Sequence, residues 1–128
     1  IMPKPAQNTK QEKELPSLMK KSASFVTVVT TVARKPDATR LAKLLLDRRL
    51  AARVQIFPIE SHYWWQNRLE KSREYRLEAK TTAQKAPLAT ATLARAHPYE
   101  VPEILTLPIL TGHPPYLAWL KKETTPAR

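Results

Sequence analysis

The chain has 128 residues, with 22 Lys and Arg against 11 Asp and Glu, which gives a formal net charge of +11. Its length suits one domain, and a hydrophobic share of 42% is enough for a core. The absence of Cys excludes disulfide bonds, thiolate metal ligands and a cysteine nucleophile. No apolar run reaches the ~18 residues that a membrane-spanning helix requires. Such a basic surface either attracts polyanions or serves solubility alone.

The first 23 residues differ in composition from the remainder. They contain five Lys and two Glu among Gln, Pro and Ser, without apolar periodicity and without the apolar stretch of a signal peptide. We predict a basic flexible or partner-bound tail at 1–23, a domain at 24–122 and a C-terminal tail at 123–128. The absence of Cys fits a reducing compartment, so we expect a cytoplasmic protein. The basic tail and the start at Ile1 favour the alternative of a mitochondrial or plastid protein after presequence removal.

The domain begins with a predicted strand and helix. Segment 24–32 is rich in Val, Thr and Phe, which suit a half-buried strand. Pro36 and Asp37 then open a helix, because Pro is tolerated in the first turn and an acidic side chain favours the positive helix end. This helix should end near Leu50. Helical spacing gives it an apolar stripe of Ala38, Leu41, Ala42 and Leu45.

Two strands joined by a tight turn follow. They are predicted over 54–65 and 69–82, with the turn around Asn67, because Asn tolerates left-handed conformations. The second strand alternates apolar and charged side chains, which indicates one buried and one polar face. Its buried side is predicted to hold Tyr75, Leu77 and Ala79. Trp64 and Trp65 point to opposite faces, so one should lie in the core and the other at an interface.

The last third of the domain predicts a helix, a strand and a short final helix. The Ala-rich segment 83–96 favours a helix that stops at His97, because the residue before a proline avoids the helical region. Segment 104–110 predicts a strand that is an edge or carries a bulge, since Pro108 cannot donate a ladder bond. A helix follows at 114–122. In the helix at 83–96, the positions predicted to be buried are Leu88, Ala91 and Leu93.

The order strand, helix, strand, strand, helix, strand is that of the ferredoxin-like βαββαβ pattern. We therefore predict an α+β fold with an antiparallel sheet, a long hairpin, both main helices on one face and a short C-terminal helix. The other sheet face would be bare in a monomer. Its mixture of charged and apolar positions favours self-association.

Catalytic constellations are not visible in the sequence. It has no glycine-rich phosphate loop, no paired carboxylates at telling spacing and no nucleophile elbow, so we predict that the protein is not an enzyme. His62, His97 and His113 lie far apart and form no metal-ligand spacing. A histidine beside a proline at a helix end, such as His97, is commonly a capping or hydrogen-bonded residue.

Three sequence motifs, taken together and in their order along the chain, resemble those of a known protein family. The segments YWWQNRLEKSREYRLEAKTT, HPYEVPEILTLPI and PPYLAWL resemble the CutA family of divalent-cation tolerance proteins, over roughly 24–122. The resemblance implies a ferredoxin-like homotrimer that responds to copper and other divalent ions without an established reaction. It implies His97 and Glu103 as candidate ligands of a divalent ion. It also implies a cleft between subunits that contains Lys80, Tyr99, Trp65, Trp119 and Tyr116.

The sequence departs from that family at the end of the first strand. Some members have a Cys there, whereas this chain has Thr30 and Thr31, which are not soft ligands for copper. The high charge is also unusual for the family. A second function therefore stays open, in which the fold serves as a structural subunit of a larger, organellar complex. Its basic surface would then bind RNA or an acidic protein.

Overall fold

The structure is a computed structural model that describes residues 23–126. The predicted N-terminal tail therefore lies, except for its last residue, outside the described residues, and so does the end of the predicted C-terminal tail.

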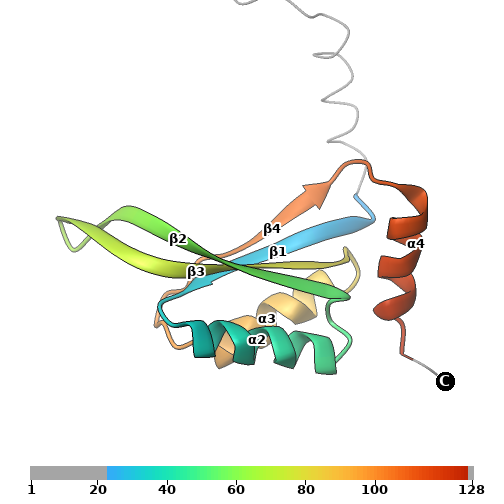
Figure 1. Cartoon of the computed structure of the whole chain (residues 1–128), viewed down its shortest axis with the longest axis horizontal. Coiled ribbons are helices and arrows are strands. Elements are labelled where there is room, and N and C mark those ends of the chain that lie inside the picture. The colour runs from blue at the N-terminus through green and yellow to red at the C-terminus, as the bar shows by residue number, and fades with distance from the viewer. Residues whose placement is uncertain (1–22, 127–128) are drawn as a thin grey trace, which may run out of the picture.

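Four strands and three helices follow one another along the described chain (Figure 1). The strands form one antiparallel sheet in the order β2-β3-β1-β4, so β2 and β4 are its edges. This is the predicted ferredoxin-like topology, with Pro108 on an edge strand as its missing N–H requires. The elements are β1 (Phe25–Val32), α2 (Lys35–Asp47), β2 (Arg53–Trp65), β3 (Arg68–Thr82), α3 (Ala86–Ala96), β4 (Ile104–Ile109) and α4 (Pro114–Glu123).

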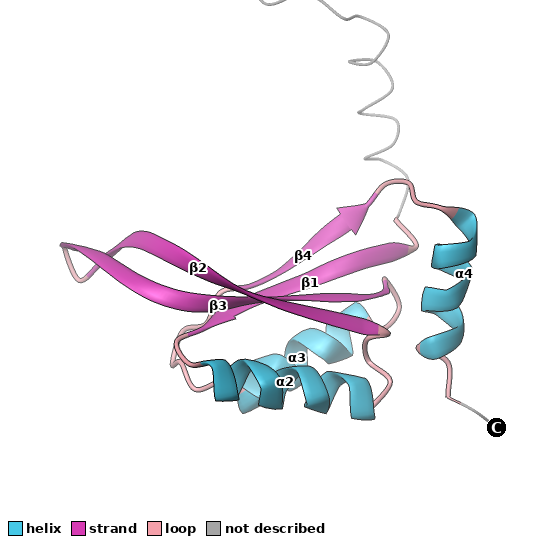
Figure 2. Cartoon of the chain, in the orientation of Figure 1, coloured by secondary structure: helices cyan, strands magenta, loops and turns pink. Residues whose placement is uncertain are grey.

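The core lies between the sheet and the two helices α2 and α3, which cover the same sheet face (Figure 2). The predicted stripe of α2 is confirmed, since all four of its members are buried. The alternation of β3 is confirmed as well, with Leu77 and Ala79 each 1% exposed. Cross-strand partners share a face, so the register places Val28 of β1 beside Ala79 in this core. None of the helices within residues 23–126 is both long and apolar enough to cross a membrane.

The buried side of α3 differs from the prediction. Leu93 is buried as expected, but Leu88 is 58% exposed and Ala91 is exposed too. The face that meets the sheet is made of small side chains instead, because they let the helix approach the strands closely. These side chains are Ala86, Ala89 and Thr92.

The helix α2 ends at Asp47, before the predicted limit at Leu50. The backbone N–H of Arg49 donates to the Leu46 carbonyl at 3.0 Å, and that of Leu50 donates to the Leu45 carbonyl at 2.9 Å. Arg49 itself is left-handed, with φ 55. These features form a Schellman motif, in which Leu45 and Leu50 supply the buried apolar pair. Leu50 therefore belongs to the core as part of the helix cap.

The hairpin of β2 and β3 extends past the rest of the sheet, because β1 pairs with β3 only from Tyr75 onward (Figure 1). Gln66 and Asn67 have φ 49 and 62, so the predicted tight turn is confirmed. Trp64 and Trp65 are 71% and 51% exposed. The prediction that one of them lies in the core is wrong for the single chain, because no helix within residues 23–126 covers this part of the hairpin.

The sheet face turned away from α2 and α3, here called the open face, carries exposed apolar side chains. Leu105 and Leu107 of β4 are 48% and 42% exposed. The strand register places Phe57 and Trp65 of β2 on the same face. An apolar surface of this kind is suited to contact with another protein chain.

Candidate functional site

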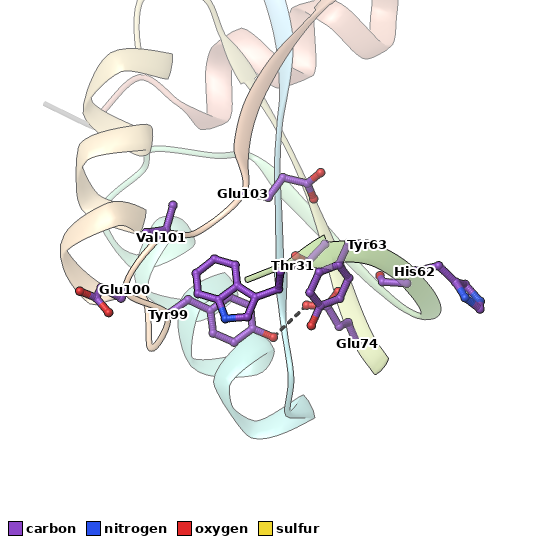
Figure 3. Close-up of a pocket in the computed structure, with 10 residues that line it drawn as sticks. Thr31, His62, Tyr63, Glu74, Tyr99, Glu100, Val101 and Glu103 are labelled. Carbon is purple, nitrogen blue, oxygen red and sulfur yellow. Dashed lines mark hydrogen bonds between the residues drawn. The ribbon is translucent and has the colours of Figure 1, made fainter. Parts of the chain in front are cut away.

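A pocket of about 590 Å³ lies where the hairpin, the end of β1 and the loop after α3 meet (Figure 3). Alternate positions of β2 and β3 bring polar and aromatic side chains to the open face at this point. The pocket is lined by Thr31 of β1, by Ser61, His62, Tyr63, Trp65 and Glu74 of the hairpin, and by Tyr99, Glu100, Val101 and Glu103 of the loop.

A buried carboxylate and a tyrosine form the base of the pocket. Glu74 is only 8% exposed, and the Tyr99 hydroxyl donates a hydrogen bond to Glu74 Oε2 at 2.8 Å (Figure 3). Burial, followed by this bond and the negative charge of Glu74, raises the pKa of Tyr99 above its ordinary value. Tyr99 therefore keeps its proton and acts as a charge-assisted donor to the carboxylate.

His97 fixes the loop to the end of β1. The backbone N–H of Tyr99 donates to His97 Nδ1 at 3.0 Å, so Nε2 carries the ring proton. This Nε2 lies 3.0 Å from the Thr31 carbonyl oxygen and 3.0 Å from Thr30 Oγ1. Thr30 Oγ1 in turn donates to the Glu103 carbonyl oxygen at 2.7 Å. Both ring nitrogens of His97 are thus engaged in holding the loop in place.

The environment of His97 also favours its neutral form. Burial lowers the pKa of His97, the nearby Arg40 lowers it further, and the bond to the Thr31 carbonyl partly opposes these effects. A neutral ring suits the observed bonds, because Nδ1 must be an acceptor to receive the Tyr99 N–H.

Four of the five residues that the resemblance assigned to a cleft fall into two groups in the single chain. Trp65 and Tyr99 line the pocket, together with Glu103, which was predicted as a metal ligand. Tyr116 and Trp119 lie outside it on α4, where their rings are 5.7 Å apart. The meeting of both groups in one cleft between subunits stays a prediction.

Lys80 also lies outside the pocket. Its ammonium nitrogen is 3.8 Å from Glu78 Oε2, and both side chains are partly covered on the open face of β3. This pairing gives Lys80 a local partner two residues away.

Sequence reasoning missed Glu74. In the sequence it is one of several charged residues that alternate along β3, and no local signal separates it from Glu78. Its burial arises because Tyr99, 25 positions away, closes over it.

The described residues do not assemble a metal centre by themselves. Among them, no group of three His, Cys, Asp or Glu side chains lies close enough to hold one ion. Ligation by His97 would also require one of its ring nitrogens to give up a hydrogen bond. A resident metal ion therefore does not fit the single chain as it stands, and a shared ion on His97 and Glu103 stays a prediction.

The fold defines the chain as an α+β protein of ferredoxin-like topology with a long hairpin. Residues 26–123 match the family model described as CutA1 divalent ion tolerance protein. The chain belongs to this family.

Relatives come from bacteria, archaea, plants and animals. The divalent-cation tolerance protein CutA of Thermus thermophilus is 41% identical over 98 residues, which cover 76% of this chain and 95% of the relative. Protein CutA of Mus musculus is 36% identical over 104 residues, which cover 80% of this chain. The chain spans 56% of that mouse protein and 56% of the chloroplastic Protein CutA 1 of Oryza sativa.

Solved structures of the family have the same fold. The periplasmic divalent cation tolerance protein CutA from Archaeoglobus fulgidus aligns with a TM-score of 0.77 at 32% identity, over 79% of this chain and 99% of that one. CutA1 from Oryza sativa aligns with a TM-score of 0.77 at 36% identity, over 83% of this chain and 98% of that one.

Proposed function

We propose that the protein is a non-enzymatic homotrimer that acts in the response to divalent metal ions, copper among them. Membership of the divalent ion tolerance family supports the link to metal ions. The observation that carries the assembly is the apolar open face, where Leu105, Leu107 and Trp65 are about half exposed in one chain. Burial of such side chains against other copies contributes roughly 25 cal/mol for each Å² removed from water.

The pocket supports a binding role. Its tyrosine hydroxyl is committed to a carboxylate, and its histidine neighbour is committed to two backbone groups. Neither group is left in the state of a nucleophile or a general base, which needs a free partner within reach of substrate. In a trimer, side chains from a second copy would join this pocket and supply the ligands that one chain lacks.

Size-exclusion chromatography with light scattering tests the assembly, and copper content after desalting tests the ion. We expect a mass of three chains and retained copper that decreases in both His97→Ala and Glu103→Gln. The matched control is Asp47→Asn, because Asp47 lies on α2, is absent from the pocket lining and pairs with Lys43 at 3.2 Å. A monomer would remove the trimer from the proposal. A trimer with unchanged copper in both variants would remove these two ligands.

A structural role in a larger complex is the second candidate, and the net charge of +11 favours it. Three copies would concentrate this charge in one particle, which polyanions such as RNA would neutralise. The compartment would be the cytoplasm or an organelle, and the chloroplastic relative from rice supports the latter. We expect RNA binding that weakens steeply between 50 and 200 mM salt, roughly tenfold or more. Binding that is independent of salt would exclude this role.

A further inference from the structure

The pocket has the opposite charge character to the chain as a whole. The chain is strongly basic, yet the described residues that line the pocket contain three glutamates and neither Lys nor Arg. Glu74 lies at the base, and Glu100 and Glu103 come from the loop, where the Glu100 carboxylate points away from Tyr99 and Glu74 (Figure 3). The pocket therefore offers a cation a local site on a surface that otherwise repels it.

Glu74 adds a carboxylate oxygen that a ligand in the pocket can reach. The side chain is more than nine-tenths buried, and only Oε2 receives a hydrogen bond from a described residue, the Tyr99 hydroxyl. Oε1 has no hydrogen-bond donor among the described residues, although Glu74 lines the pocket. Oε1 is not among the fully buried polar atoms without a partner in the described residues, so it keeps access to the pocket and can accept a hydrogen bond from a ligand that supplies an N–H.

The remaining walls are aromatic. Tyr63 and Trp65 come from β2 and Tyr99 comes from the loop after α3, and all three border the same space. Aromatic faces attract cations and also accept the apolar part of a ligand. In the same pocket, the described chain presents no group of three metal-ligating side chains. These walls favour an organic cation with an aliphatic portion over a bare metal ion.

We propose that this pocket binds the ammonium group of a small aliphatic amine between its aromatic side chains and Glu74. The ammonium donates to the free oxygen of Glu74, and Glu103 contributes a second negative charge at the pocket. A primary ammonium has three N–H donors for these oxygens, whereas a quaternary ammonium has none. The proposal goes beyond the response to metal ions and does not depend on it.

Calorimetric titration of the full chain, in whatever assembly it forms, tests the proposal with 1,4-diaminobutane as the probe. We expect saturable binding that is at least tenfold weaker in Glu74→Gln and in Glu103→Gln. Asp47→Asn is the matched control and should bind as the unchanged chain does, because Asp47 is an exposed carboxylate on α2 that is absent from the pocket lining and pairs with Lys43. Circular dichroism checks that each variant is folded.

Three further ligands identify which feature is recognised. Tetramethylammonium has charge without N–H donors, 1-butanol has an apolar chain without charge, and Mg²⁺ has charge without an apolar portion. We expect each to bind at least tenfold more weakly than the diamine. Equal binding of any one of them, or binding of the diamine that Glu74→Gln leaves unchanged, would overturn the proposal. Copper retention in the same variants is measured in a separate experiment. A variant set that shows no copper binding would therefore contradict the proposed metal role without changing the result for the amine.

Discussion

Two buried threonines on neighbouring strands differ in what their hydroxyl groups contact. Thr30 Oγ1 donates to the Glu103 carbonyl and lies beside His97. Thr81 is 0% exposed, and its Oγ1 has no hydrogen-bond partner in the part of the chain that the structure describes. A threonine hydroxyl thus fixes the loop after α3 by hydrogen bonds in one strand, whereas in the other strand it is an unsatisfied polar atom.

This contrast predicts opposite effects of the same substitution. Thr81→Val should raise the free energy of unfolding by about 1 kcal/mol, because it replaces an unsatisfied buried hydroxyl with a methyl group of similar shape. Thr30→Val should lower it by about 1–3 kcal/mol, because it leaves the Glu103 carbonyl without its side-chain donor and removes one of the two partners of His97 Nε2. Urea denaturation at one fixed chain concentration measures both. Equal destabilisation by the two substitutions would contradict the assignment.

The lowered pKa of His97 predicts a pH dependence of stability. Above about pH 6.5, the ordinary value, His97 is neutral in both the folded and the unfolded chain and has no effect. As the pH falls below that value, the unfolded chain takes up the proton first, so the free energy of unfolding decreases until the lowered folded pKa is reached.

Denaturation at pH 8.0 and pH 5.5 measures this effect. The decrease in stability between the two should be smaller in His97→Gln than in the unchanged chain, although His97→Gln is less stable at pH 8.0. His113→Gln serves as the control, because His113 takes no part in the hydrogen bonds that His97 makes with Thr30, Thr31 and Tyr99. An unchanged decrease in His97→Gln would show that other groups cause it.

At the scale of elements, the cap of α2 explains why the helix ends where it does. An apolar pattern continues through Leu50, but the Schellman motif turns the chain at Arg49, whose left-handed φ costs a residue with a Cβ about 1 kcal/mol. The Arg49 side chain offsets part of this cost, since its guanidinium lies 2.9 Å from Glu123 Oε2 and joins the cap to α4.

Substitutions at Arg49 distinguish the contribution of its backbone conformation to stability from that of its side chain. Arg49→Gly and Arg49→Ala both remove the ion pair, but Gly should be more stable than Ala by about 1 kcal/mol because it adopts positive φ freely. At the exposed, mid-helical Lys43 the order should reverse, with Ala more stable by about 1 kcal/mol. Thermal denaturation of the four variants compares the pairs. If Gly and Ala variants had the same order of stability at both positions, the assignment of Arg49 to a left-handed helix cap would be contradicted.

At the scale of the whole molecule, the two sides of the sheet have different roles. One side is closed by α2 and α3 (Figure 2). The other side exposes apolar residues of β4 and the hairpin. Under the proposed trimer, the second side is where subunits meet. The pocket lies on this same side, so assembly and ligand binding would be coupled there.

A charge placed on the open face should therefore weaken assembly. Leu107→Lys should shift the mass in light scattering from three chains toward one, with association weakened at least tenfold, because burial of an unpaired ammonium is costly. Leu88→Lys is the matched control, since Leu88 is exposed on α3 away from this face. Loss of the trimer in both variants, or in neither, would argue against the open face as the interface.

The features that the sequence by itself determined depend on near neighbours. The stripe of α2, the alternation in β3 and the turn at Asn67 follow from spacing and local backbone preference, and each is confirmed. The order of elements predicted the ferredoxin-like topology, and three motifs indicated the CutA family that the comparisons show. These signals survive in sequence because each arises within a few residues or within one element.

Other features were decided only by tertiary structure, because they depend on what packs across distant positions. The buried face of α3 is set by small side chains that allow a close approach to the sheet, and the larger Leu88 is left exposed. Glu74 is buried because Tyr99 lies over it, and the tautomer of His97 is set by backbone groups on either side of the ring. The pocket exists because the hairpin, β1 and the loop after α3 converge on one sheet face.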